Sequence, residues 1–387
     1  MTNLAIMLLR LSLLAVPLLG LVLVRRYLVW DDLARFDQPR PRSVNAGQPV
    51  SDGTARIQAM AKAHEHLLRG EDLPALRAAQ EGSMMDFFGD DGRPSPDVEF
   101  RDVRAGDVPA EWVLAPGADP DQRLLYVHGG SWNSGNPRTH RTITERLSRR
   151  LGVAVLSIDY RLLPEHRRTD GIADCREAYR WILEHGPDRP GRPRELWVGG
   201  DSAGGNLALM LITWARDEGL RQVDGVIGLS SCTDVTFASP SIRDNADSDL
   251  FLGPGTETLR RLPKAVVVAI SWWSYRIHPA DPMVSPLRGD LAGLPPTLLL
   301  ASTAEMLLDD SVRYANKAKA AGSPAELRLW DHMEHDWPLF APILDEGEAA
   351  FDHIADFVEE QRRRRDNRGR SEDPVVVGRE REPVPTQ

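Results

Sequence analysis

The stretch WVGGDSAGGNLALML, residues 197–211, runs from an apolar segment through a turn of small residues into a second apolar segment. Within it, Gly200-Asp201-Ser202-Ala203-Gly204 matches the pattern G-x-S-x-G. This pattern is typical of a sharp strand-to-helix turn, because glycines two before and two after the serine let the strand and the helix approach each other. The serine is held in a strained conformation at a helix N-terminus, which favours developing negative charge. The stretch therefore predicts a strand, a tight turn that presents a hydroxyl, and a helix.

Two other uses of a glycine-rich turn are disfavoured by spacing. A phosphate-binding loop requires G-x-x-x-x-G-K-S/T, and no lysine follows the glycines here. A dinucleotide fingerprint requires G-x-G-x-x-G near the first strand of a domain, whereas this stretch lies mid-chain without that spacing. A turn that only needs small residues stays open as an alternative to a nucleophilic serine, so motifs elsewhere in the chain must distinguish the two.

From about residue 98 onward, short apolar runs alternate with helical patterns. The predicted strands are 111–115, 124–127, 153–158, 196–198, 226–229, 297–301 and 327–330. The predicted helices lie near 138–151, 171–185, 204–217, 309–321 and 345–361. This alternation indicates an α/β fold with a mostly parallel central sheet and helices on both faces. In such a sheet ligands bind beyond the carboxyl ends of the strands, so polar residues directly after strands are the candidates for function.

The predicted α/β domain covers residues 98–361, and a helical lid is expected within it. The segment between the strands at 226 and 297 is too long for one crossover. It contains the apolar helix candidate TETLRRLPKAVVVAISWWSYR, residues 256–276, which Pro263 interrupts. We therefore expect a lid insertion over about residues 236–280.

Two flanking segments have a different composition from the α/β domain. Residues 31–97 are predicted to form a linker followed by a helical lid element, with apolar residues at helical spacing over 54–69 and a second helix after Asp72. Residues 362–387 are charged and contain prolines without an apolar period. That composition predicts a disordered tail.

The N-terminal segment, residues 1–30, is strongly apolar. Residues 4–24, LAIMLLRLSLLAVPLLGLVLV, contain Arg10 as their single charge. A helix of that length spans about 30 Å, the thickness of a bilayer core, which predicts a membrane anchor. A secretory signal peptide is the alternative, and it is disfavoured because no clear small-x-small cleavage site follows. Arg25 and Arg26 favour a cytoplasmic C-terminal side and Arg10 opposes it, so the side of the membrane stays open.

The net charge and the number of cysteines exclude some kinds of partner and site. The chain of 387 residues has a net charge of −10, which argues against a nucleic-acid partner because such binding depends on neutralising phosphates. Its two cysteines, Cys175 and Cys232, form neither a zinc pattern nor a disulfide framework. We expect no metal and no cofactor.

A second glycine motif follows the predicted strand at 124–127. It reads His128-Gly129-Gly130-Ser131-Trp132, and consecutive glycines free backbone N–H groups to point at a ligand. On a strand earlier than the serine, this is where an acyl-transfer enzyme places half of its oxyanion hole. We predict the N–H groups of Gly129 and Gly130, with that of Ala203, as donors. Which N–H groups between Gly129 and Ser131 donate stays open, and His128 is interpreted as a brace for the loop.

Together the motifs resemble a known family. HGGSW at 128–132, DYRLLPEH at 159–166 and GDSAGGNLAL at 200–209 are similar to the hormone-sensitive-lipase-like branch of the α/β-hydrolases. That branch includes bacterial esterases, arylacetamide deacetylases and steryl acetyl hydrolases. The resemblance continues through DPMVSPLRGDLAGLPPTLLL at 281–300 and spans about residues 110–360. It implies the α/β-hydrolase fold and a Ser–acid–His triad, in that chain order, that hydrolyses carboxylic esters.

The acid of such a triad follows the strand at 297–301, where Glu305, Asp309 and Asp310 are candidates. The family pattern usually has Asp-Pro-Leu, with a second Asp four residues after the first. Aligned in that way, Glu305 takes the acid position, although Glu replaces the commoner Asp and Met306 replaces Pro. A glutamate can still orient a histidine and stabilise its imidazolium. We interpret Asp309 and Asp310 as caps of the following helix.

The base follows the last strand. WDHMEHDW, residues 330–337, offers His332 and His335. The family motif places the histidine two residues after a methionine, which selects His335, and His332 is interpreted as a surface histidine. Histidines without strand-end placement, such as His140, are interpreted as surface or packing residues.

These residues predict a serine hydrolase that acts on a small-molecule ester. Ser202 attacks the carbonyl after His335 takes its proton, Glu305 orients His335, and the reaction proceeds through an acyl-enzyme. An amidase or deacetylase, or a lactone hydrolase, with the same triad is an alternative. A binding protein of the same fold without turnover is disfavoured, because such proteins typically lose the histidine that His335 provides here.

Overall fold

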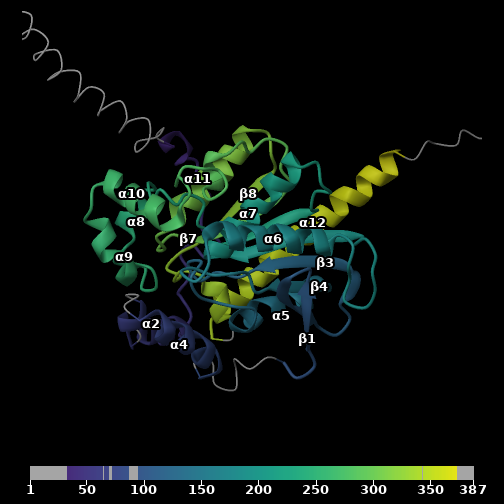
Figure 1. Ribbon diagram of the computed structural model, residues 1–387, viewed down its shortest axis with the longest axis horizontal. Coiled ribbons are helices and arrows are strands. Elements are labelled where there is room, and N and C mark those ends of the chain that lie inside the picture. Colours follow the sequence, from purple (N-terminus) through teal and green to yellow (C-terminus); the bar gives the residue numbers. More distant parts are fainter. Residues whose placement is uncertain (1–32, 64, 69–71, 87–94, 342, 373–387) are drawn as a thin grey trace, which may run out of the picture.

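The computed structural model describes residues 33–372 except residues 64, 69–71, 87–94 and 342. In this part of the chain, eight strands form one central sheet in the order β1-β2-β4-β3-β5-β6-β7-β8 (Figure 1). The strands are β1 (Glu99–Ala105), β2 (Val108–Leu114), β3 (Asp119–Val127), β4 (Val153–Ile158), β5 (Glu195–Asp201), β6 (Gly225–Leu229), β7 (Thr297–Ser302) and β8 (Ala325–Trp330). β2 pairs antiparallel with both β1 and β4, and the other neighbours are parallel. The predicted mostly parallel sheet is confirmed.

Strand β1 has no counterpart among the predicted strands. It lies at the edge of the sheet, and four of its seven residues are charged, namely Glu99, Arg101, Asp102 and Arg104. An edge strand with a solvated face needs no continuous apolar run, and charges on it discourage pairing with another chain. The pattern of short apolar runs therefore could not reveal it.

Helices cover both faces of the sheet, as predicted. One face carries α5 (Arg141–Leu151) and α12 (Asp345–Glu372), and the other carries α6 (Arg168–Ile182), α7 (Ser202–Asp217) and α11 (Leu308–Ala320). Because side chains alternate along a strand, Leu124 and Tyr126 of β3 join the core under α5 and α12, whereas Leu125 and Val127 join the core under α6 and α7. Short 3-10 helices lie at Ala34–Phe36 (η1), Arg138–His140 (η3), Pro286–Arg288 (η4) and Trp337–Phe340 (η5).

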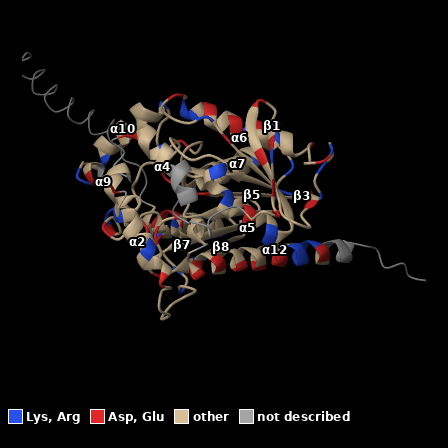
Figure 2. Cartoon of the chain, turned by 90° about the horizontal axis from the view of Figure 1, so that it is seen from below, with Lys and Arg blue, Asp and Glu red and all other residues tan. Residues whose placement is uncertain are grey.

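Two further groups of helices lie together at one end of the molecule (Figures 1 and 2). The N-terminal group comprises α2 (Gly53–Ala63), α3 (Glu65–Leu68) and α4 (Leu73–Asp86), and the inserted group comprises α8 (Ser241–Asp244), α9 (Gly253–Arg260) and α10 (Lys264–Tyr275). α3 contacts α9, so the two groups meet. The expected break at Pro263 is confirmed, because α9 ends before this proline and α10 begins directly after it.

The outer face of α10 is apolar and exposed. Val266, Ile270 and Trp273 follow the spacing of one helical face and are 41%, 41% and 69% exposed. The neighbouring Trp272 is 40% exposed. Figure 2 shows α10 at the periphery of the molecule. This surface is the largest group of exposed apolar side chains in the part of the chain that the structure describes.

Residues 37–44, which belong to the segment predicted as a linker, pack against the α/β domain. Arg40 bonds Asp309, Arg313 bonds Asp37, and the N–H of Val44 donates to the carbonyl of β8 Leu329 at 2.7 Å. The composition of this segment resembles a linker because its contacts to the domain are made by polar side chains and backbone rather than by an apolar face.

The predicted boundary of the disordered tail at residue 362 is wrong, because α12 continues to Glu372. Arg362 and Arg365 both form ion pairs with the buried carboxylate of Glu195 at the start of β5. These pairs hold another turn of helix that has no apolar period. Residues 373–387 lie outside the described residues.

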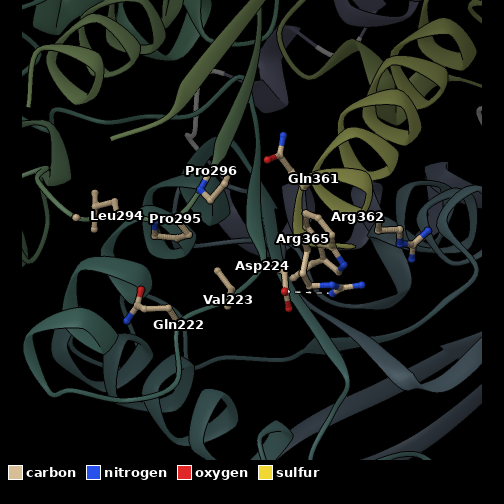
Figure 3. A pocket seen from close by; sticks show the side chains of 11 residues that line it. Gln222, Val223, Asp224, Leu294, Pro295, Pro296, Gln361, Arg362 and Arg365 are labelled. Atoms are coloured by element: carbon tan, nitrogen blue, oxygen red, sulfur yellow. Dashed lines mark hydrogen bonds and ion pairs between the residues drawn. The ribbon is translucent and has the colours of Figure 1, made fainter. Parts of the chain in front are cut away.

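A pocket of about 240 Å³ lies beside these arginines (Figure 3). Its wall includes Val223 and Asp224, which precede β6, and Pro295 and Pro296, which precede β7. The pocket is therefore at the amino ends of the strands, on the opposite edge of the sheet from the predicted site.

The predicted membrane segment, residues 4–24, lies outside the described residues. Within the described ranges, no helix is both long enough and apolar enough to cross a membrane.

Candidate active site

Ser202 sits at the junction of β5 and α7 in the strained turn that the sequence predicts. Its φ is +48°, in the left-handed region that residues with a side chain rarely adopt. A Cβ added to Gly204 would lie 2.0 Å from the carbonyl oxygen of Val127, and one added to Gly200 would lie 2.6 Å from Gly204. Both positions therefore require glycine, and their close packing holds Ser202 above the end of the sheet.

The structure brings the three predicted triad residues together. Nε2 of His335 lies 3.0 Å from Oγ of Ser202, and Nδ1 of His335 lies 2.8 Å from Oε2 of Glu305. All three residues are buried. Because Nδ1–H donates to the carboxylate, the lone pair of Nε2 points at the serine hydroxyl. This is the arrangement in which a serine can be deprotonated as it attacks.

Glu305 is fixed by the turn that follows β7. Its Oε1 accepts the backbone N–H of Ser302 at 2.9 Å, which leaves Oε2 for His335. Met306, at the position of the family's usual proline, donates its N–H to Asp249 Oδ2 at 2.9 Å. The departure from the family pattern therefore leaves Glu305 in hydrogen-bond contact with His335.

The interpretation of Asp309 and Asp310 as helix caps is wrong. The N-terminus of α11 has no side-chain cap. Asp309 instead accepts the N–H of Ser241 at 2.9 Å, and Asp310 accepts the N–H groups of Thr233 and Asp234 at 2.7 and 2.9 Å. These carboxylates accept hydrogen bonds from the segments that follow β6. Those segments lie about 70 positions earlier in the sequence, so local sequence patterns do not reveal the contacts.

Gly129 does not supply an oxyanion donor in this structure, which corrects one of the predicted positions. Its N–H donates to Oδ2 of Asp201 at 3.0 Å. The N–H groups of Gly130 and Ser131 have no acceptor among the described residues. Ala203 lies in the first turn of α7, where N–H groups have no partner within the helix. Of the predicted donors, Gly130 and Ala203 therefore stay available, with Ser131 as the third.

Asp201 connects the glycine loop to the turn that carries Ser202. Its Oδ1 accepts the hydroxyl of Tyr126 at 2.5 Å, and its Oδ2 lies 3.2 Å from Nε2 of His140. Burial would raise the pKa of Asp201, but His140 and then Tyr126 lower it below the usual range. His140 is thus a buried residue that supports the site, which agrees with the packing alternative of its interpretation from sequence and not with the surface alternative. No local spacing links His140 to residue 201.

His128 is a neutral residue that supports the loop, as expected. Its ring stacks on Tyr160 with centroids 4.4 Å apart, and Nδ1 lies 2.8 Å from the carbonyl oxygen of Gly129. Burial, followed by the nearby His140, lowers the pKa of His128 to about 3. His332 is exposed, in agreement with its interpretation as a surface histidine.

Asp336 is a polar neighbour of the site that sequence reasoning missed. Its Oδ2 lies 3.1 Å from Nε2 of His335. Burial lowers the pKa of His335, but Asp336 and then Glu305 raise it well above the ordinary histidine value. The residue after the histidine therefore acts on the same nitrogen as Ser202.

The structure shows no cluster of His, Cys, Asp and Glu side chains able to hold a metal ion in the residues that it describes. Cys175 and Cys232 are both buried free thiols.

Comparison with known proteins gives one consistent family. Residues 124–339 match the family model described as the alpha/beta hydrolase fold. An acetyl-hydrolase of Streptomyces hygroscopicus is 33% identical over 296 residues, which cover 76% of this chain and 91% of that protein. An esterase of Acinetobacter venetianus is 33% identical over 264 residues, which cover 68% of this chain and 83% of that protein.

Solved structures agree with this assignment. An esterase from the bacterial hormone-sensitive lipase family is 34% identical and superposes with a TM-score of 0.68, covering 81% of this chain and 99% of that chain. An esterase/lipase from an uncultured bacterium is 31% identical with a TM-score of 0.67, covering 80% of this chain and 99% of that chain. The chain therefore belongs to the α/β-hydrolase fold family, in the branch of the hormone-sensitive-lipase-like esterases.

Proposed function

We propose that this protein is a serine hydrolase that cleaves carboxylic esters through an acyl-enzyme, with Ser202 as nucleophile, His335 as base and Glu305 as the orienting acid. The observation that carries the proposal is the continuous hydrogen-bonded chain from Glu305 through His335 to Ser202. The names of the relatives, acetyl-hydrolase and esterase, support the ester bond as the target.

The chemistry follows from the arrangement of these atoms. Nε2 of His335 takes the proton of Ser202 while Oγ forms a bond to the ester carbonyl carbon. The negative charge that develops on the carbonyl oxygen is stabilised by the N–H groups of Gly130, Ser131 and Ala203. His335 then protonates the leaving alcohol, and water repeats the cycle on the acyl-enzyme.

The test combines labelling with activity. A fluorophosphonate probe followed by peptide mapping is expected to modify Ser202. Ser202→Ala is expected to reduce hydrolysis of p-nitrophenyl acetate by roughly 10⁴-fold or more with an unchanged circular dichroism spectrum. Ser157→Ala, which removes another buried hydroxyl on β4, is the matched control and is expected to keep its activity. Full turnover by Ser202→Ala would refute the proposal.

The triad does not determine which acyl group and which alcohol the ester substrate carries. Amides and lactones are attacked by the same machinery, so an amidase or lactone hydrolase is the second candidate. A panel of esters from C2 to C16, with matched amides and lactones, identifies the preferred bond through kcat/KM. A higher kcat/KM for the amide of a matched pair would replace the esterase assignment by an amidase.

We also propose that residues 4–24 hold the enzyme at a membrane. The length and apolar composition of this segment support the proposal. The exposed apolar face of α10 carries Trp272 and Trp273, and tryptophan is enriched at membrane interfaces. The full chain is expected in the membrane fraction after carbonate washing, and a chain that starts at residue 33 is expected to be released. If the protein is expressed as the full chain but is recovered without residues 4–24, the segment is instead a cleaved signal peptide.

A further inference from the structure

We propose that Asp336 is a second acid partner of His335, which acts at Nε2 and raises the pH at which the enzyme becomes active. The inference rests on the proposed function, because His335 is taken as the catalytic base. Asp336 is a positioning and tuning residue in this proposal, since it acts through His335 and not on the substrate.

The geometry at Nε2 carries the inference. This nitrogen must receive the proton of Ser202, and it lies 3.0 Å from the serine Oγ and 3.1 Å from Oδ2 of Asp336. Nδ1 on the other side of the ring is occupied by Glu305 at 2.8 Å. The imidazole nitrogen has either one lone pair or one hydrogen, so Ser202 and Asp336 compete for it.

The position of the Asp336 carboxylate requires an unfavourable backbone conformation and leaves one of its oxygens unpaired. Its φ is +55°, in the left-handed region, and its N–H donates to Oγ of Ser230 at 3.2 Å. The side chain is 13% exposed, and its Oδ1 is buried without a hydrogen-bond partner in the described part of the chain. A buried carboxylate oxygen without a partner is unfavourable. His335 is therefore the main group that compensates the charge of Asp336.

The charged and titratable surroundings of the pair come from several elements. Besides His335, the neighbours that interact electrostatically with Asp336 are Asp201 at the end of β5, Glu305 after β7, His140 in η3 and Tyr126 in β3. Glu334 also acts on His335 from the same loop. Burial raises the pKa of Asp336 to about 7, and Asp201 and Glu305 add to this rise while His335 opposes it.

In this proposal the two side chains carry one shared proton at low pH, located on Nε2 of His335 or on the carboxyl group of Asp336. While that proton is present, either Nε2–H donates to Asp336 or the carboxyl O–H donates to Nε2, and in both cases Nε2 cannot accept the proton of Ser202. Loss of the shared proton at higher pH frees the lone pair of Nε2. When Nε2 then takes the serine proton, the imidazolium faces an ionised Asp336, which stabilises it until the proton passes to the leaving alcohol.

The test is the pH profile of kcat/KM for Asp336→Asn. Asparagine has nearly the same shape and tolerates the left-handed conformation, but it carries no charge. The midpoint of the acid limb is expected to move to lower pH by about 1–2 units, the effect of removing a neighbouring opposite charge from a histidine. Asp331→Asn is the matched control, because Asp331 belongs to the same loop and bonds Ser43 and Thr303 instead of His335. Its profile is expected to stay unchanged.

A second measurement separates this inference from the proposed function. Titration of His335 is followed by nitrogen-15 NMR in the Ser202→Ala background, with and without Asp336→Asn. The midpoint is expected at lower pH in the double variant. Unchanged titration and an unchanged acid limb would overturn the role of Asp336. A shifted titration, together with no ester hydrolysis by the protein that retains Ser202, would retain this role and overturn only the esterase proposal. Asp336→Gly repeats both measurements if the asparagine variant is poorly folded, since glycine adopts this φ freely.

Discussion

The carboxylate of Asp201 accepts the N–H of Gly129 at 3.0 Å, so the residue before the serine fixes the loop that faces the serine. The turn that carries Ser202 and the glycine loop are therefore directly linked by a hydrogen bond. Tyr126 and His140 hold the same carboxylate from two other elements. Because the N–H of Gly129 donates to Asp201, the N–H groups of Gly130, Ser131 and Ala203 are the ones that stay available to an oxyanion.

Gly130→Ala tests the oxyanion loop. An added Cβ would lie 2.3 Å from the carbonyl oxygen of Ser134, and the φ of +103° is unfavourable for alanine, so the loop must shift. Losing one donor is expected to reduce kcat by about 10²–10³-fold. Gly117→Ala is the control, because Gly117 also has a positive φ of +83° but open space around it. Equal kcat values for the two variants would contradict the assignment of Gly130.

Glu305→Gln tests the acid. The N–H of Ser302 holds one side-chain oxygen of residue 305, so the new amide NH₂ is expected to face Nδ1 of His335. Nδ1 must then accept a hydrogen bond, and the proton moves to Nε2, which can no longer act as a base. We expect kcat to fall by about 10⁴-fold, as for a wrong tautomer. Asp309→Asn is expected to retain most activity. If Asp309→Asn is the inactive variant, the acid has been assigned to the wrong residue.

Truncation at the C-terminus tests the extension of α12. A chain that ends at Gln361 lacks Arg362 and Arg365 and leaves the buried Glu195 without these cationic partners. Breaking a buried pair from one side costs about 3 kcal/mol or more, so thermal unfolding is expected at a clearly lower temperature. A chain that ends at Glu372 keeps both pairs and is expected to melt like the full chain. Identical melting of the two truncated chains would restore the prediction of a tail from residue 362.

Asp310→Asn tests the stability contribution of a buried carboxylate through pH. Burial, followed by the neighbouring Asp234, raises the pKa of Asp310 to about 7. Because this folded-state pKa lies above the unfolded value, the stability that the protonated form contributes is lost as pH rises from about 4 through about 7. The wild type is therefore expected to lose stability relative to Asp310→Asn by roughly 2–4 kcal/mol over this window. Urea unfolding at pH 5 and pH 8 measures the difference, and parallel changes in the two proteins would contradict it.

Much of the fold could be predicted from local sequence patterns. The seven predicted strands are all present, because buried parallel strands are short apolar runs that stand out between helical patterns. Edge strand β1 has no such run. The position of Ser202 also follows from sequence, since it stands directly after a strand. For the other two triad positions, strand ends supplied only candidate residues, and the family resemblance selected Glu305 and His335 from them.

The remaining parts of the site depend on contacts between distant segments. Asp201 bonds Gly129 across 72 positions, and Glu195 pairs with Arg362 across 167 positions. Neither pair leaves a periodic signal in the chain. The same holds for Asp336, whose neighbour in sequence is His335 but whose side-chain direction depends on a left-handed backbone.

The sequence by itself therefore determined seven of the eight strands of the sheet and the strained turn around Ser202, and with the family resemblance it also determined the three residues that meet there. These features depend on short apolar runs, small residues and strand ends, which are local. The tertiary structure alone decided which N–H groups stay free for an oxyanion, which carboxylate holds the glycine loop and that Asp336 reaches Nε2 of His335. The physical reason is that hydrogen bonds and buried charges are matched between distant segments only when the chain has folded.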